Sequence, residues 1–236
     1  MKNEWAVDKR RASLEFFGFV GFAFLFKLTL DPFIWKFSGP VSLIGTILVL
    51  TIYLRSRGET WGQLGFVRLS KIRSWLLLVP QAFLAMVGII ALGASVFLIG
   101  EHFQIDFIQQ RPEGVDERWG DVRGNLPVFL LWLGIVWTSA AFGEEMFFRG
   151  FLIDRSLKMF ADVRFGTILA ILLPALVFGV GHMYYQGLRG LITTGLIGLW
   201  LGALFLGYRK NLWPLVVAHG LIDSLTFTAE YLDLDI

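Results

Sequence analysis

The sequence of 236 residues contains no cysteine. Without thiols the chain can form no disulfide bond, bind no metal ion through thiolate and use no cysteine nucleophile. The same absence removes the usual indicator of the redox compartment. Any chemistry at a site must therefore come from carboxylate, imidazole, hydroxyl or guanidinium groups.

Charged residues are also scarce. They make up 17% of the chain, against 56% hydrophobic residues that include 23 Phe and 9 Trp. This composition is too apolar for an ordinary soluble domain of this length and predicts an integral membrane protein. The net charge of +2 gives no electrostatic reason to expect a nucleic-acid partner, so none is predicted.

Long apolar runs divide the sequence into candidate membrane helices. A run of about 20 residues crosses a hydrocarbon core roughly 30 Å thick. The first run follows basic residues, as in a signal peptide, but no small-residue cleavage site follows it, so we expect a retained span. The predicted fold class is all-α, a polytopic integral membrane helical bundle of about seven transmembrane helices. The runs cover residues 13–30, 40–54, 74–100, 126–148, 166–183, 189–207 and 212–229.

Basic residues predict the orientation of this bundle, because Lys and Arg near span ends favour the cytoplasmic side. The N-terminal tail, residues 55–73, residues 149–164 and the pair Arg209 and Lys210 together hold 15 of the 21 Lys and Arg residues. The acidic loop 101–124 and the C-terminus fall on the other side. An N-terminus in the cytoplasm satisfies every connection. The segment 57–75 reads equally well as an interfacial segment or a solvated connection.

Three ionisable residues interrupt the fourth apolar run in "EEMFFR". A charge at bilayer depth costs several kcal/mol and so normally faces a cavity or a partner. Glu145 and Arg149 have i, i+4 spacing, which predicts an ion pair on one helical face. Glu144 is turned about 100° away and is not committed to that pair. The alternative is that all three form a snorkelling cluster at the cytoplasmic end of the span.

Two histidines lie on apolar helices. His182 ends "FGVGH", and His219 begins "HGLID", where Asp223 lies one turn further along. Glu145 and His182 are equally far from the turn "ADVRFG", roughly 25 Å at 1.5 Å per residue, which predicts that they are neighbours. His219 is only about 12 Å from its own turn, which predicts a height mismatch of about a dozen ångströms unless helix starts are offset or a helix is bent.

These groups suit the hydrolysis of an amide. A carboxylate held away from water can take a proton from water and return it to a leaving amine. A zinc site built from His182, His219 and one glutamate is a second arrangement with the ligand types of a hydrolytic centre, although the H-E-x-x-H signature is absent. Ser139 and Ser224 lack the pattern that flanks a serine nucleophile.

The three motifs together resemble a known family, the CAAX prenyl endopeptidase and bacteriocin-processing (CPBP, or Abi) intramembrane proteases. That family has Glu-Glu-x-x-x-Arg, then Phe-x-x-x-His, then His-x-x-x-Asn or Asp on successive membrane helices. The resemblance covers about residues 125–230. It divides one membrane domain into two parts. Residues 1–124 are N-terminal helices with an interfacial segment and an acidic loop, and residues 125–230 are a catalytic core.

This resemblance implies an α-helical membrane endopeptidase that cuts a membrane-associated peptide or protein from a cavity within the bilayer. Glu144 would be the general base, Glu145 and His182 would assist water activation, and His219 and Asp223 would form the oxyanion side. Arg149 and Phe178 would support them, and Zn²⁺ remains the alternative to direct activation by glutamate.

Two departures from the family pattern are present. Asp223 stands where eukaryotic prenyl-protein proteases have Asn, and eight spans are common in those proteases where seven are counted here. The compact chain resembles a bacterial member of the family, which implies a location in the bacterial plasma membrane. Its substrate need not be prenylated.

Two further functions fit the same residues. A non-catalytic scaffold or immunity-type protein could bind a peptide partner in the cavity. A proton-coupled transporter could use intramembrane Glu, His and Asp as a relay, although the sequence lacks two matched halves.

Overall fold

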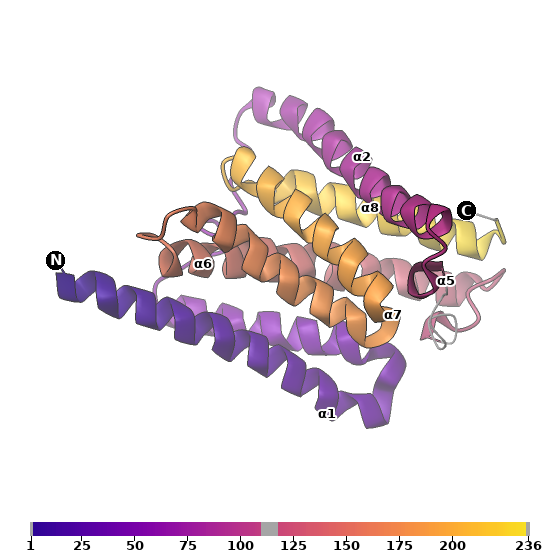
Figure 1. Ribbon diagram of the computed structural model, residues 1–236, viewed down its shortest axis with the longest axis horizontal. Helices are drawn as coiled ribbons and strands as arrows, with labels where there is room; N and C mark the ends of the chain where they lie inside the picture. Colours follow the sequence, from indigo (N-terminus) through magenta and orange to yellow (C-terminus); the bar gives the residue numbers. More distant parts are fainter. Residues whose placement is uncertain (1, 110–117, 235–236) are drawn as a thin grey trace.

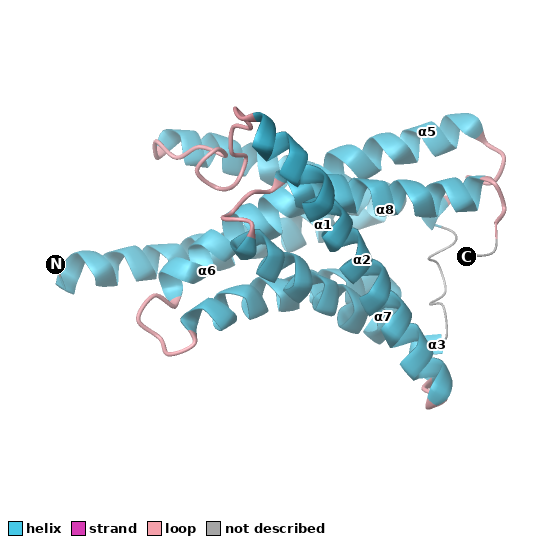
Figure 2. Ribbon diagram, turned by 90° about the horizontal axis from the view of Figure 1, so that it is seen from above, coloured by secondary structure: helices cyan, strands magenta, loops and turns pink. Residues whose placement is uncertain are grey.

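The computed structural model describes residues 2–109 and 118–234, with side chains from residue 8 onward. Within these ranges every regular element is a helix and no strand occurs, as Figure 2 shows. The all-α prediction is therefore confirmed for the described part of the chain.

Four helical stretches are long and apolar enough to cross a membrane: Asp8–Ser56, Ile72–His102, Leu126–Met159 and Gly166–Gly207. The third is a continuous rod of three elements, and it holds the "EEMFFR" motif. The elements are α1 (Lys2–Ser56), α2 (Ile72–His102), α3 (Asp106–Gln109), α5 (Leu126–Ile135), η1 (Val136–Leu152), α6 (Ile153–Met159), α7 (Gly166–Gly207) and α8 (Trp213–Tyr231).

The helices α1 and α7 each consist of two arms joined at a kink (Figure 1). In α1 the backbone leaves helical geometry at Ile34, two residues after Pro32, whose ring cannot continue the hydrogen-bond ladder. In α7 the break is at Gly187, with φ 62° and ψ −160°. Only glycine adopts that region without strain, so Gly187 fixes where the chain turns back.

The middle of the rod is a π-helix, η1, whose i→i+5 hydrogen bonds make it wider than an α-helix. Its last bond joins the Ile153 N–H to the Phe148 carbonyl. Gly143 and Gly150 allow neighbours to approach closely, since a Cβ at Gly150 would lie 3.0 Å from the Leu64 carbonyl oxygen. The apolar periodicity predicted only a helix here, and π-helical stretches are common at functional sites.

Apolar side chains cover the outside of the bundle, whereas several charges lie inside it. Phe33 is 82% exposed and Ile72 is 76% exposed. By contrast Glu145 is 0% exposed, and Arg149 and Arg155 are each 1% exposed. This reverses the arrangement of a soluble protein and is what a lipid solvent selects.

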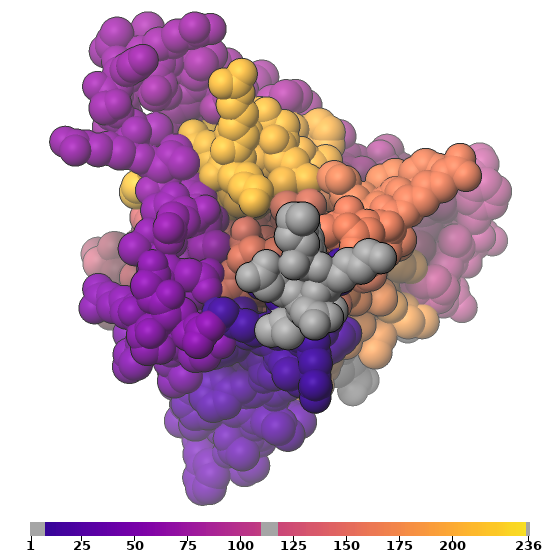
Figure 3. Space-filling view, turned by 90° about the vertical axis from the view of Figure 1, so that its left-hand side faces the viewer, coloured from indigo at the N-terminus to yellow at the C-terminus, as the bar shows by residue number. Residues whose placement is uncertain are grey.

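An ionic network ties together one end of the bundle. The buried Arg155 of α6 donates to Glu15 of α1 (2.5 Å), to Glu59 after α1 (2.7 Å) and to Asp154 (2.7 Å), while Lys210 pairs with Asp154 at 3.4 Å. Figure 3 looks onto this end, where α1, the segment after α1, the α6–α7 connection and the start of α8 meet. The four basic segments therefore gather at one end, as predicted.

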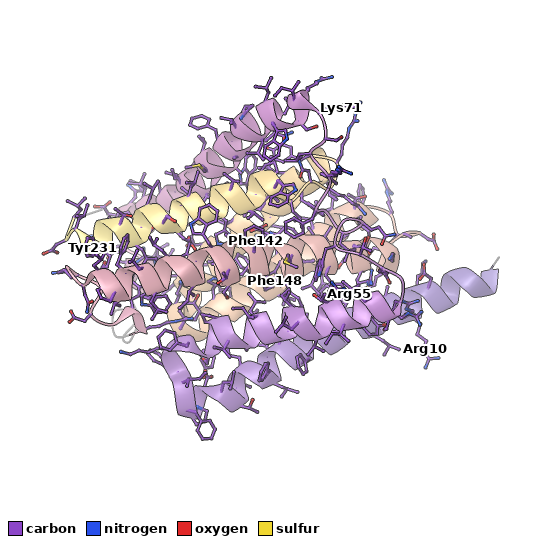
Figure 4. The ribbon with its side chains drawn as sticks, turned by 180° about the vertical axis from the view of Figure 1, so that it is seen from behind. Arg10, Arg55, Lys71, Phe142, Phe148 and Tyr231 are labelled. Atoms are coloured by element: carbon purple, nitrogen blue, oxygen red, sulfur yellow. The ribbon has the colours of Figure 1, made fainter. Side chains whose placement is uncertain are left out.

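The other end holds the start of the rod and the C-terminal part of α8. The Gly124 N–H donates to the Tyr231 carbonyl at 3.0 Å, and Arg123 pairs with Asp233 at 2.9 Å. In Figure 4, Arg10, Arg55 and Lys71 lie toward one end and Tyr231 at the other. Residues 110–117 of the acidic loop and the last two residues lie outside the described residues.

The segment between α1 and α2 packs against the bundle. Leu64 is 3% exposed, the Gly65 carbonyl accepts a hydrogen bond from the Leu212 N–H at 2.9 Å, and the Phe66 ring lies 5.0 Å from that of Trp213. A purely solvated connection is therefore wrong for this part, because its apolar side chains are used in packing.

Candidate active site

A cavity of about 360 Å³ lies inside the bundle, between α1, the rod, α7 and α8. Its wall is mostly apolar, and the π-helix η1 places Glu144 on that wall while Glu145 turns away from it. Figure 4 shows Phe142 and Phe148 of the same helix in the middle of the bundle. The ionisable and amide side chains of the wall are Lys27, Arg118, Glu144, His182, Tyr185, Gln186, His219 and Asp223.

Glu145 is a buried acceptor behind the cavity wall. Its Oε1 accepts from Arg149 Nη1 at 3.0 Å and from His219 Nδ1 at 2.9 Å. The predicted Glu145–Arg149 ion pair is therefore confirmed. With its proton on Nδ1, His219 donates this hydrogen bond to Glu145. The bond orients the imidazole so that Nε2 faces the cavity.

Glu144 and Asp223 both approach that exposed nitrogen of His219. Glu144 Oε2 lies 3.9 Å from Nε2 and Asp223 Oδ2 lies 3.6 Å from it. The predicted contact between His219 and Asp223 is thus present. Glu144 makes no side-chain hydrogen bond to any described residue, and its side chain is 18% exposed. Of the two adjacent glutamates, Glu144 is the one left available to a bound molecule.

Glu144 and His182 were predicted to be neighbours and do line one cavity, but no hydrogen bond or ion pair of the described residues joins His182 to either glutamate. His182 lines the same cavity, but its Nδ1 lies 3.0 Å from the Phe178 carbonyl oxygen of its own helix. The Phe178 ring separates it from the ion pair: this ring is 4.5 Å from the His182 ring and 4.6 Å from the Arg149 guanidinium carbon.

An offset helix start explains why His219 takes that place. Leu212 is fully buried, and a Cβ on Gly150 would lie 3.3 Å from Leu212 Cδ1. The helix α8 therefore begins beside Gly150 rather than at the level of the α6–α7 turn. His219, seven residues further along α8, reaches Glu145, and the mismatch expected from equal helix starts disappears.

The described residues contain no group of three or more His, Asp or Glu side chains placed to hold a metal ion. The two-histidine, one-carboxylate set does not fit zinc in this arrangement, so no chemical step below passes through a metal.

Four cavity residues were not found from the sequence: Lys27, Arg118, Tyr185 and Gln186. Arg118 stands among the charges of an acidic loop, where nothing in the local pattern marks it. Lys27 is an intramembrane charge, which was an available signal, whereas Tyr185 and Gln186 directly precede the break at Gly187 and carry no charge that would mark them.

The fold and the site together define a class: a helical membrane protein with carboxylate and imidazole groups facing an internal cavity. Residues 126–225 match the model of a protein family described as type II CAAX prenyl endopeptidase Rce1-like. The match contains all three motifs and confirms the resemblance to the CPBP family. It supports an integral membrane protein of a protease family. No curated protein and no solved structure matched the chain.

Proposed function

We propose that the protein is an intramembrane endopeptidase that hydrolyses a peptide bond of a membrane-associated peptide or protein. The observation that carries this proposal is the difference between the contacts of the two adjacent glutamates. Glu145 is committed to Arg149 and His219, whereas Glu144 faces the cavity without a hydrogen bond to any described residue. A free carboxylate beside an oriented imidazole is suited to general-base catalysis.

Glu144 takes one proton from a water molecule, and the resulting hydroxide adds to the carbonyl carbon of the substrate. When His219 carries both ring protons, its Nε2–H can donate to the developing oxyanion. The proton on Glu144 then goes to the leaving amine as the C–N bond breaks. Glu145 acts as a positioning residue, because it reaches the cavity only through His219.

Asp223 and His182 complete this assignment. Asp223 lies 3.6 Å from His219 Nε2 and can orient that ring or, when protonated, donate to the oxyanion. His182 lies on the wall of the same cavity and assists in placing water or substrate. Phe178 packs between His182 and Arg149, so it supports both groups sterically.

The topology that we propose has seven crossings. The two arms of α1, the helix α2, the rod, the two arms of α7 and the helix α8 each run from one end of the bundle toward the other (Figure 1). The basic end faces the cytoplasm of a bacterial cell in this proposal. Residues 1–124 would cover a catalytic core formed by residues 125–230, and the substrate need not be prenylated.

The test uses the full chain reconstituted in vesicles with a library of lipid-anchored peptides. The wild type is expected to release fragments, and Glu144→Gln is expected to bind the same peptides without cleaving them. Metal content is measured in the same preparations, which separates direct glutamate catalysis from a zinc enzyme. Equal cleavage by both proteins would remove Glu144 from the catalytic role.

A non-catalytic scaffold predicts another pattern. Neither protein would then cleave any peptide, yet both would bind with equal affinity, and cells carrying Glu144→Gln would keep the wild-type phenotype. Proton-driven solute uptake into the same vesicles would instead indicate the transporter.

A further inference from the structure

The cavity has a basic region apart from its carboxylates. Arg118 lies on the wall, half-buried, with its guanidinium carbon 4.2 Å from the centre of the Tyr185 ring. On the other side it meets α1, where a Cβ on Gly39 would lie 3.0 Å from Arg118 Nη2. A glycine and an aromatic face thus hold a planar cation against the cavity.

Arg118 differs from the other cation of the wall. Lys27 Nζ lies 3.0 Å from both carboxylate oxygens of Asp31 and 3.6 Å from the Tyr184 ring centre, so its charge is already compensated. No carboxylate of the described residues lies within ion-pairing distance of Arg118. Among the described residues, its guanidinium is therefore the arginine or lysine group of the wall that has no ion-pair partner.

The backbone beside Arg118 is anchored to the bundle. The Trp132 indole N–H donates to the Trp119 carbonyl at 2.9 Å, and the Trp119 ring lies 5.1 Å from the ring of Phe227 on α8. Phe227 is eight residues beyond His219, about 12 Å along α8. These contacts hold the segment that carries Arg118 against the bundle, where Arg118 and His219 line the same cavity.

Charge is thus separated along the cavity. Glu144 and Asp223 lie around His219, and an anionic group placed there would be repelled. The same group beside Arg118 would form a charge-assisted hydrogen bond. A peptide whose carboxylate lies apart from the scissile bond would therefore bind in one direction, with its neutral amide at Glu144.

We propose that Arg118, supported by Tyr185, forms an anion subsite that binds a carboxylate of the substrate peptide. The carboxylate is supplied by a free peptide C-terminus or by an acidic side chain. This inference rests on the proposed peptidase function, because it assigns the cavity to a peptide. Arg118 lies outside the matched segment 126–225, so the family match gives it no role.

The test measures peptide binding with the full-length Glu144→Gln protein in phosphatidylcholine vesicles. The probes are lipid-anchored peptides made with a free C-terminal acid or a C-terminal amide, and a second set of amides with Asp or Asn at each position. We expect the acidic form of one set to bind about ten- to a hundredfold more tightly than its neutral counterpart. The set that shows the preference identifies the source of the carboxylate.

Arg118→Gln is expected to abolish this preference while keeping the affinity for neutral peptides. Arg118→Lys keeps the positive charge and should retain part of the preference for the acidic peptide. The matched control is Arg123→Gln, a nearby exposed arginine paired with Asp233, which should leave the preference unchanged. An unchanged preference in Arg118→Gln, or equal binding of charged and neutral peptides by the starting protein, would overturn the subsite.

Cleavage of the same peptides by the protein with Glu144 intact separates the two proposals. Binding that depends on Arg118 without any cleavage would support the subsite and contradict the peptidase. Cleavage at a rate that depends neither on Arg118 nor on peptide charge would support the peptidase and contradict the subsite.

Discussion

Arg149 shows how a charge can be held inside this bundle. The side chain is 2% exposed, its Nη1 donates to Glu145 at 3.0 Å, and its guanidinium packs on Phe178. Removing one partner of a buried ion pair leaves the other charge without compensation, which is a large cost in a medium of low polarity. The arginine therefore stabilises the fold and holds the Glu145 side chain behind His219.

We expect Arg149→Met to lower the free energy of unfolding by about 3–5 kcal/mol, because methionine fills the space but removes the cation paired with Glu145, which then keeps only its contact with His219. Denaturation in detergent micelles, followed by circular dichroism, measures the change. Arg123→Met is the control, with an expected change of about 0.5 kcal/mol or less, since that ion pair is exposed. Similar losses in both variants would show that the buried Arg149–Glu145 pair stabilises the fold no more than the exposed Arg123–Asp233 pair does.

At the scale of elements, the site depends on how closely α8 approaches the π-helix η1. Gly220, next to His219, has no side chain at the point where Trp137 of η1 packs, and a Cβ there would lie 2.7 Å from the indole ring. This contact brings His219 within reach of Glu144 and Glu145. Packing at one glycine is thus linked to the geometry of the carboxylates.

Gly220→Ala is expected to push α8 away from η1 and to lower both stability and peptidase activity. Overpacking of this kind costs about 1–3 kcal/mol. Gly134→Ala is the control on the same rod, because nothing lies within 4 Å of a Cβ at Gly134. Melting temperature and cleavage rate are measured for both variants. Equal and small effects would contradict a close approach at Gly220.

Whole-molecule topology can be tested directly because the chain has no cysteine. Lys71 lies at the basic end (Figure 4), and Asp121 is three residues before Gly124, which is bonded to Tyr231 at the opposite end; both are exposed. In intact cells an impermeant maleimide is expected to label Asp121→Cys, whereas Lys71→Cys should react only after lysis. The reverse pattern would place the N-terminus outside. Labelling of both positions from outside would contradict a membrane crossing by α2, which lies between them.

Much of this architecture could be predicted from the sequence. Apolar runs indicated helices, basic segments indicated which ends meet, and the spacing of Glu145 and Arg149 indicated their pair. The choice between His182 and His219 could not be made, because it depends on where α8 begins relative to Gly150, and that is set by packing of Leu212. The π-helix and the position of Arg118 likewise depend on contacts between distant segments.

The central claim is that Glu144, and not its neighbour Glu145, removes the proton from water. The most direct measurement compares cleavage rates and melting temperatures of Glu144→Gln and Glu145→Gln on one peptide that the wild type cleaves. We expect Glu144→Gln to lower kcat by about 10²–10⁴-fold with an unchanged melting temperature. Glu145→Gln should lower the melting temperature as well, because it removes the acceptor of Arg149 and His219. A Glu144→Gln protein that cleaves at the wild-type rate would contradict the claim.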